Sequence, residues 1–224
     1  MTELPETQPR TPRQRFRAQI REEIKQAAIR QLAQSGPAGV SVNAIGKELG
    51  VSGPALYRYF TSRDELLTEL VIDAYNDLAA ALGAAINHTP NRPPRRRFDA
   101  LARAYRAWAQ AQPHRYRLLY GPPLPGYDAH AERLISASKA SMDLLVETLP
   151  NHRNTSPLPP GLADQLSEWA QNRGVQADPA NALRAILTWS RLHGFITLEI
   201  AGNYASMGID PDQIFETELR ALPA

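Results

Sequence analysis

A short segment punctuated by glycine, GVSGPALYRYF beginning at Gly50, constrains the fold of this chain more than any other stretch. The residues just before it, 42–49, have the apolar spacing of a short helix, and Ser41 is placed to cap that helix. Gly50 ends the helix in a tight turn, and Ser52 is placed to cap a second short helix over 53–60. Two short helices joined by a glycine turn are typical of a helix-turn-helix, so we predict this motif here.

Helical periodicity extends on both sides of the motif. Before it, one apolar face predicts a helix over 13–34, formed by Phe16, Ile20, Ile24, Ala28 and Leu32. After it, Ser62 and Glu65 have the spacing of a capping box and begin a helix that runs to about Ile86.

Further helices are predicted along the remaining sequence, and Pro- and Gly-rich segments separate several of them. Their expected ranges are 97–112, 113–120, 129–149, 161–173, 179–206 and 211–222. No convincing strand pattern occurs, so we predict an all-α fold with an N-terminal helix-turn-helix three-helix domain and a C-terminal helical domain.

Charge is unevenly distributed along the chain. Residues 1–63 contain 10 Lys and Arg against 5 Asp and Glu, a net +5, whereas residues 64–224 contain 15 against 18, a net −3, and together these give the formal net charge of +2. The basic N-terminal third indicates an anionic partner for that part, although a solvated basic surface would carry the same charge.

Composition limits the environment and the chemistry. The chain has no cysteine, which excludes disulfides and thiolate metal sites. No apolar run approaches the roughly 18 residues of a membrane span, and the first residues lack the apolar core of a secretion signal. We therefore expect no membrane partner and a cytoplasmic location.

The residue types in the second helix of the motif suit a DNA groove. The second helix of a helix-turn-helix lies in the major groove with its N-terminal residues at the base edges. Small residues at Ser52, Gly53 and Ala55 allow close approach of the backbone. Tyr57 offers a hydroxyl for phosphate, and Arg58 offers a fork of donors.

The segment VSVNAIGKELGVSGPALYRYFTSRDELL resembles the DNA-binding segment of tetracycline-repressor (TetR) family regulators. Two positions depart from the family pattern: Gly46 stands where alanine is usual, and Arg63 stands where lysine is usual. The resemblance implies contacts with a double-stranded DNA operator. The implied DNA-binding residues are Arg13, Arg15, Arg17, Ser41, Asn43, Ser52, Gly53, Pro54, Ala55, Tyr57, Arg58, Tyr59 and Arg63, where the first three act as a basic arm together with Arg10.

The last third resembles a C-terminal regulatory domain of the same family, marked by Trp189, His193 and Gly194. The predicted helix 179–206 is apolar nearly all round, which is typical of a helix buried on two faces. The resemblance implies that this helix and the last one pair with a second copy to form a homodimer, although a core helix of a monomer would show the same pattern. The implied dimer residues are Leu183, Leu187, Gly194, Leu198, Phe215 and Leu219.

Aromatic residues gather in the same half of the chain. Each one singly is more typical of core packing, but as a set they can line a cavity for a small-molecule effector. The predicted pocket residues are Tyr105, Trp108, Tyr116, Tyr120, Met142, Trp169, Trp189 and His193. The segments are then a disordered tail at 1–12, a helix-turn-helix DNA-binding domain at 13–62, a connecting helix at 63–86, and a ligand-binding and dimerisation domain at 87–224.

Sequence signatures of enzymes are absent. The five histidines have no metal-ligand spacing, and no nucleophile elbow, P-loop or glycine-rich nucleotide fingerprint occurs. We therefore predict no catalytic, cofactor-binding or metal-binding residues and a ligand-responsive transcriptional regulator, most simply a repressor. Two alternatives stay open: an α-helical small-molecule-binding or catalytic protein with an incidental helix-turn-helix, and a ligand-independent DNA-packaging protein.

Overall fold

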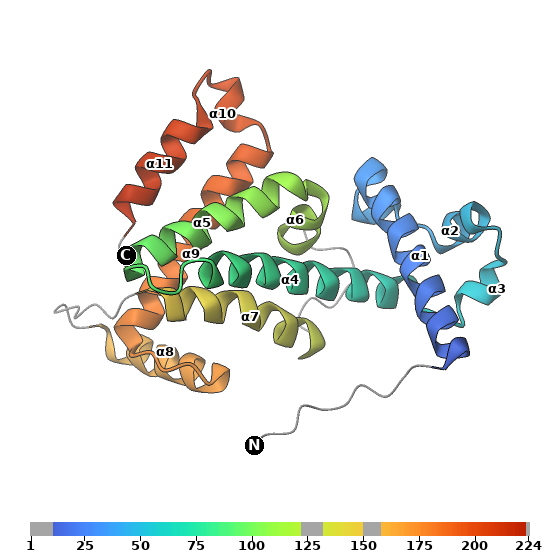
Figure 1. Cartoon of the computed structure of the whole chain (residues 1–224), viewed down its shortest axis with the longest axis horizontal. Coiled ribbons are helices and arrows are strands. Elements are labelled where there is room, and N and C mark those ends of the chain that lie inside the picture. Colours follow the sequence, from blue (N-terminus) through green and yellow to red (C-terminus); the bar gives the residue numbers. More distant parts are fainter. Residues whose placement is uncertain (1–10, 122–131, 150–157, 223–224) are drawn as a thin grey trace. The chain divides into compact units, whose positions relative to one another are not determined.

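The computed structural model describes residues 11–121, 132–149 and 158–222, and every regular element in these residues is helical (Figure 1). The all-α prediction is confirmed. The elements are α1 (Pro12–Ser35), the 3-10 helix η1 (Pro37–Gly39), α2 (Val42–Leu49), α3 (Gly53–Leu56), α4 (Arg63–Asn87), α5 (Pro94–Ala111), α6 (Pro113–Tyr120), α7 (Glu132–Thr148), α8 (Pro160–Arg173), α9 (Pro179–Ile200), α10 (Asn203–Ser206) and α11 (Pro211–Ala221).

The described residues divide into two compact units, and the division falls inside α4. Residues up to Leu70 form the N-terminal unit, and residues from Val71 form the C-terminal unit. The helix predicted as a connector is therefore shared between the units. Of the tail predicted over 1–12, residues 1–10 lie outside the described residues, whereas Thr11 caps α1 and Pro12 begins it.

The N-terminal unit is held together by a small apolar core and by caps that the sequence predicted. Ile24, Leu32, Ile45, Leu56 and Leu67 are all buried in this unit. The Ser41 hydroxyl accepts a hydrogen bond from the Ala44 amide at 3.3 Å, which satisfies one of the free N–H groups at the start of α2. Gly50 ends α2 in the left-handed region, at φ 67°, where a side chain would be strained.

Three local predictions for the N-terminal unit were wrong in detail. The helix expected over 53–60 ends at Leu56 and continues as turns, and Ser52 makes no side-chain cap bond. Phe16 was expected on the apolar face of the first helix, but it is 61% exposed, because that face is covered only from Ile24 onward. In the predicted capping box, Ser62 Oγ accepts a hydrogen bond from the Glu65 amide at 3.0 Å. The Glu65 carboxylate, however, accepts from the amide and hydroxyl of Thr61 and not from the amide of Ser62.

The C-terminal unit is built around α9, which contacts α5, α7, α8 and α10. Its core includes Phe98, Leu101, Leu192, Ile196 and Phe215. The helix predicted over 179–206 is broken, because Gly202 adopts the left-handed region at φ 79° between α9 and α10. The start of the helix predicted over 129–149 lies outside the described residues.

A single arginine links three helices of the C-terminal unit. The guanidinium of Arg106 on α5 bonds to Glu199 on α9 at 2.5 Å and to Asp212 on α11 at 2.6 Å. It also lies over the Phe215 ring, 4.7 Å from the centroid. Because the Arg106 and Glu199 side chains are largely buried, this pair fixes α9 against α5, and the contact with the Phe215 ring adds α11.

Candidate functional site

The second helix of the helix-turn-helix presents a polar outer side and an apolar inner side. Ser52, Pro54 and Arg58 are exposed, and the Tyr57 side chain is 48% exposed, whereas Leu56 is buried. An aromatic residue this exposed is available to a partner rather than to the core. The structure therefore brings the predicted base-edge residues of α3 to one surface of the N-terminal unit.

The remaining predicted contact positions of this motif are arranged around the same helices. Ser41 and Asn43 are exposed at the start of α2, and Gly53, Ala55 and Tyr59 are half-buried. A methyl group at Gly53 would lie 3.2 Å from Asn43 Oδ1, so α2 and α3 approach closely at these two residues. We call the exposed residues Ser41, Asn43, Ser52, Pro54, Tyr57 and Arg58 the reading surface.

Close packing behind the reading surface depends on Gly46. A Cβ at this position would lie 2.9 Å from the carbonyl oxygen of Val51 and 3.1 Å from Leu56 Cδ1. The first of these contacts is with backbone, which cannot move aside as a flexible side chain can. The departure from the usual alanine thus matches a turn that lies unusually close to α2 in this chain.

Arg63, which was predicted as a phosphate contact, also donates hydrogen bonds within the N-terminal unit. Its Nε donates to the Val40 carbonyl at 2.9 Å, and its Nη2 donates to the Pro37 carbonyl at 2.7 Å. These bonds join the start of α4 to η1 and the residue after it. Nη1 makes only a 3.8 Å ion pair with Asp64, so this side of the guanidinium stays partly exposed.

The three arginines predicted in a basic arm lie in the first turns of α1. Thr11 caps this helix in a reciprocal capping box with Gln14. Arg13, Arg15 and Arg17 are exposed, and Arg17 Nη2 donates to the Arg58 carbonyl at 3.2 Å. These side chains are therefore carried by a helix rather than by a flexible arm, and Arg10 lies outside the described residues.

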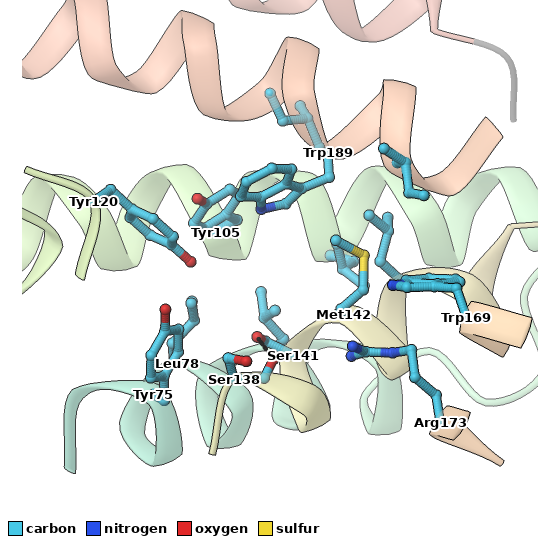
Figure 2. Close-up of a pocket in the computed structure, with 15 residues that line it drawn as sticks. Tyr75, Leu78, Tyr105, Tyr120, Ser138, Ser141, Met142, Trp169, Arg173 and Trp189 are labelled. Atoms are coloured by element: carbon cyan, nitrogen blue, oxygen red, sulfur yellow. Dashed lines mark hydrogen bonds between the residues drawn. The ribbon is translucent and has the colours of Figure 1, made fainter. Parts of the chain in front are cut away.

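The C-terminal unit contains a pocket of about 460 Å³, within the usual range for drug-sized ligands. Five predicted residues line it, namely Tyr105, Tyr120, Met142, Trp169 and Trp189. Figure 2 shows the three tyrosines Tyr75, Tyr105 and Tyr120 toward one end and Trp169 with Arg173 toward the other. The other lining residues are Leu78, Leu82, Leu101, Ser138, Ser141, Leu145, Ile186 and Leu192.

Three residues predicted to line the pocket lie outside its lining. Trp108 is buried in the core, and its Nε1 donates to Asp77 Oδ2 at 2.9 Å. The Tyr116 hydroxyl is bonded to His193 Nδ1 at 2.9 Å and to Thr197 Oγ1 at 2.8 Å. The His193 ring stacks on Trp189 with an interplanar angle of 11°, so His193 supports a pocket wall from behind.

Burial changes the acid–base properties of this region. Burial raises the pKa of Tyr105 and Tyr120 well above the usual value of tyrosine, and nearby tyrosines add to the effect. These two phenols therefore stay neutral and can donate a hydrogen bond. Burial also lowers the pKa of His193, which favours the neutral imidazole.

Sequence reasoning missed the contribution of α4 to the pocket and, on α7 and α8, found Met142 and Trp169 but not the polar lining residues. Tyr75 belongs to α4, Ser138 and Ser141 belong to α7, and Arg173 belongs to α8. The pairs Tyr75/Leu78 and Ser138/Ser141/Leu145 have the spacing of one helix face, and that is the signal that could have indicated them.

The predicted dimer residues fall into two groups. Leu187 is 55% exposed and Leu198 is 44% exposed, while Leu183 and Gly194 are half-buried on the same stripe of α9. Phe215 and Leu219, by contrast, are each only 1% exposed, because α11 turns them into the core of its own chain. The prediction that these two side chains face a partner was therefore wrong.

Two protein-family models match this chain, one in each unit. Residues 24–70 match the family model described as bacterial regulatory proteins, tetR family, and residues 98–222 match the tetracyclin repressor-like C-terminal domain. The chain belongs to the TetR family of transcriptional regulators. It is 35% identical over 216 residues to the HTH-type transcriptional regulator Rv1816 of Mycobacterium tuberculosis, which spans 93% of this chain and 92% of that protein.

Solved structures of regulators have the same fold as this TetR-family chain. The crystal structure of the regulatory protein SCO4313 is 40% identical, with a TM-score of 0.79, covering 95% of this chain and 98% of that one. The transcriptional regulator FadR from Bacillus subtilis in complex with stearoyl-CoA shares the fold at 13% identity, with a TM-score of 0.61 over 91% of this chain and 97% of that one.

The family assignment gives the N-terminal unit of this TetR regulator its general role. The helix-turn-helix of the N-terminal unit is the DNA-binding element of the family. Among the described residues there is no cluster of three or more His, Asp or Glu that would hold a metal ion. The described helices also include none long and apolar enough to cross a membrane.

Proposed function

We propose that this protein is a homodimeric repressor that acts in the cytoplasm, binds a palindromic operator, and releases it when a small apolar or aromatic ligand enters the pocket of the C-terminal unit. The observation that carries the proposal is the combination of an exposed reading surface around α3 with an aromatic pocket in one TetR-family chain. DNA recognition would be the task of the first and effector recognition the task of the second.

The reading surface supports sequence-selective binding. Arg58 offers a fork of donors to phosphate or to a guanine edge, and Tyr57 offers an aromatic body with a hydroxyl. Asn43 lies beside Gly53, so its amide would reach the same groove as α3. Arg13, Arg15 and Arg17 would add contacts to phosphates from the start of α1.

The apolar stripe of α9 supports assembly as a dimer. Leu183, Leu187, Gly194 and Leu198 lie on one side of the helix, and two of the leucines are exposed. Gly194 has no atom of this chain within 4 Å of the position of a Cβ, so another helix has room to approach there. A helix-turn-helix protein reads two half-sites about one DNA turn apart, roughly 34–36 Å, which a twofold dimer provides.

The position of the pocket supports control by a ligand. Tyr75, Leu78 and Leu82 of α4 line it, and α4 begins at Arg63 in the N-terminal unit. A ligand that displaces this helix would change the separation of the two reading surfaces in a dimer. The fold shared with a FadR bound to stearoyl-CoA supports a ligand-binding role for this unit.

A gel-shift assay with DNA from upstream of the protein's own reading frame tests the proposal. A selective shift, with no shift of a scrambled sequence, is the expected result. Arg58→Ala should weaken the shift about 10-fold, while Arg92→Ala, which removes an exposed arginine of the C-terminal unit, should not. Equal binding to all sequences would indicate a DNA-packaging protein, and no binding at low salt would reject the regulator.

A further inference from the structure

A buried hydroxyl in the pocket lacks a partner in the chain. The Tyr105 side chain is 4% exposed, and its Oη makes no hydrogen bond with any described residue. Besides burial, the nearby hydroxyls of Tyr120 and Tyr116 raise the pKa of Tyr105, but no hydrogen bond of normal distance and angle forms with either, and the Tyr116 hydroxyl is already bonded to His193 and Thr197. Buried polar groups are nearly always hydrogen-bonded, and because Tyr105 lines the pocket, a molecule bound there can supply the missing partner.

The end of the pocket where Tyr105 lies is polar but uncharged. Figure 2 shows the hydroxyls of Tyr75, Tyr105 and Tyr120 gathered on the same side of the pocket. Among the described lining residues only Arg173 carries a charge, and it lies toward the opposite end with Trp169. Its guanidinium is held by Asp143 at 2.8 Å and by the Lys139 carbonyl at 2.7 Å. A carboxylate at the tyrosine end would therefore be desolvated without a cation to compensate it.

The walls between the two ends are flat and apolar. The Trp189 indole lines the pocket and stacks on the His193 ring, with 5.2 Å between the ring centroids. Leu78, Leu101 and Met142 also line the pocket. Aromatic walls favour ring systems, which can stack against them in offset or edge-to-face arrangements.

We infer that the effector is an uncharged ring compound of drug-like size that carries an acceptor oxygen, such as a ketone or amide carbonyl, and that this oxygen accepts a hydrogen bond from Tyr105. In an empty pocket water can serve the same hydroxyl. A ligand that displaces this water without replacing its bond loses affinity, so the hydroxyl selects for the oxygen. The inference names the effector class for the proposed function and rests on it.

A pair of matched probes tests the inference by equilibrium dialysis against the full-length protein. 2-Acetonaphthone carries the acceptor oxygen, and 2-isopropylnaphthalene has nearly the same shape without it. The wild type should bind the ketone at least about 10-fold more tightly than the hydrocarbon, because only the ketone satisfies the hydroxyl. Tyr105→Phe should remove this preference while leaving hydrocarbon binding unchanged.

Tyr116→Phe is the matched control, because it removes a buried tyrosine hydroxyl whose bonds lie within the chain. It should keep the preference for the ketone. A preference that survives in Tyr105→Phe, equal binding of the two probes by the wild type, or no binding of either at millimolar concentration would each overturn the inference.

Operator release, measured separately by gel shift, distinguishes this inference from the proposed function. Preferential binding of the ketone that is lost in Tyr105→Phe supports the effector class even if no compound releases the operator, in which case the repressor mechanism fails. Operator release by compounds without an acceptor oxygen would support the mechanism and reject the effector class.

Discussion

The two units of this chain place their functional residues in opposite ways. In the N-terminal unit the residues of the reading surface face outward, while their neighbours on α2 and α3, among them Ile45, Gly46 and Leu56, are buried. In the C-terminal unit they face inward, and the pocket is lined by residues from six helices, α4 to α9. A surface for a large, charged partner needs exposure, whereas a pocket for a small ligand needs desolvation.

This difference determines how each unit tolerates change. A substitution on the reading surface removes a contact but leaves the core of the N-terminal unit intact. A substitution in the pocket also alters the core, since Leu78, Leu101 and Leu192 belong to both. Binding and stability should therefore be separable in the N-terminal unit and coupled in the C-terminal unit.

The largest expected effect comes from a substitution that changes both DNA binding and stability in the N-terminal unit. Gly46→Val places a branched side chain against the Val51 carbonyl and Leu56, where even a Cβ is 2.9 Å and 3.1 Å away. Overpacking of this kind should destabilise the N-terminal unit by about 3 kcal/mol. Operator binding should be lost in a gel shift, and thermal unfolding should begin at a lower temperature.

The same substitution at an open site is the control for Gly46→Val. Gly161 has no atom within 4 Å of its Cβ position, so Gly161→Val should leave operator binding unchanged. Normal operator affinity in Gly46→Val would show that the turn can move away from α2, and the account of Gly46 would be wrong.

Arg63→Ala tests whether a basic residue beside the reading surface serves DNA or the fold. Because its guanidinium donates to the carbonyls of Pro37 and Val40, its loss should destabilise the protein by about 2 kcal/mol. The dependence of DNA affinity on salt, measured below the unfolding temperature, should stay the same. Arg58→Ala should do the reverse, lowering the salt slope by about 1 without a change in stability. A reduced salt slope in Arg63→Ala would support the predicted phosphate role.

Leu198→Arg tests whether the exposed stripe of α9 is an interface. Since Leu198 is 44% exposed, the arginine should leave the fold of the chain intact and act only on a partner. The dimer should weaken about 10-fold or more, equivalent to about 1.4 kcal/mol, in analytical ultracentrifugation. Ile135→Arg, at a comparably exposed position on α7, should leave the dimer unchanged. Equal behaviour of the two variants would place the interface elsewhere.

The smallest expected effect concerns pH. Burial lowers the pKa of His193, so between its folded value and the ordinary value of about 6.5 the unfolded chain binds the proton and the folded chain does not. The stability of the wild type is therefore complete above that range and falls as pH decreases through it. His193→Asn should show a smaller decrease in thermal midpoint between pH 7.5 and 5.5, and an identical decrease would exclude this residue as the cause.

The sequence indicated the N-terminal unit better than the C-terminal one, for a physical reason. The helix-turn-helix is made of adjacent residues, so its cap at Ser41 and its turn at Gly50 could be predicted from local preferences. The helix after the turn was predicted four residues too long, because Tyr57 and Tyr59 suit a helix but tertiary packing ends α3 at Leu56.

The pocket could be predicted only as a set of aromatic residues. The aromatic set in the sequence correctly included Tyr105 and Trp189 as pocket residues. It could not show that the Trp108 side chain is hydrogen-bonded to Asp77 or that the Tyr116 hydroxyl is hydrogen-bonded to His193. Such choices depend on which helices are neighbours, and a single sequence does not contain that information. The same limit explains the error on Phe215 and Leu219, whose apolar face fits a partner and a core equally well.

If the effector binds as proposed, the Tyr105 hydroxyl, which lacks a hydrogen-bond partner among the described residues, has a consequence for how the pocket could evolve. Phenylalanine would fill the same space without the cost of desolvating a polar group, about 1–3 kcal/mol when the group is left unpaired. A tyrosine at this position therefore represents stability given up for selectivity, as is common where binding residues are held in a core. Drift toward phenylalanine would produce a sturdier protein that accepts a wider range of ligands, so a single phenolic oxygen separates a selective sensor from a promiscuous one.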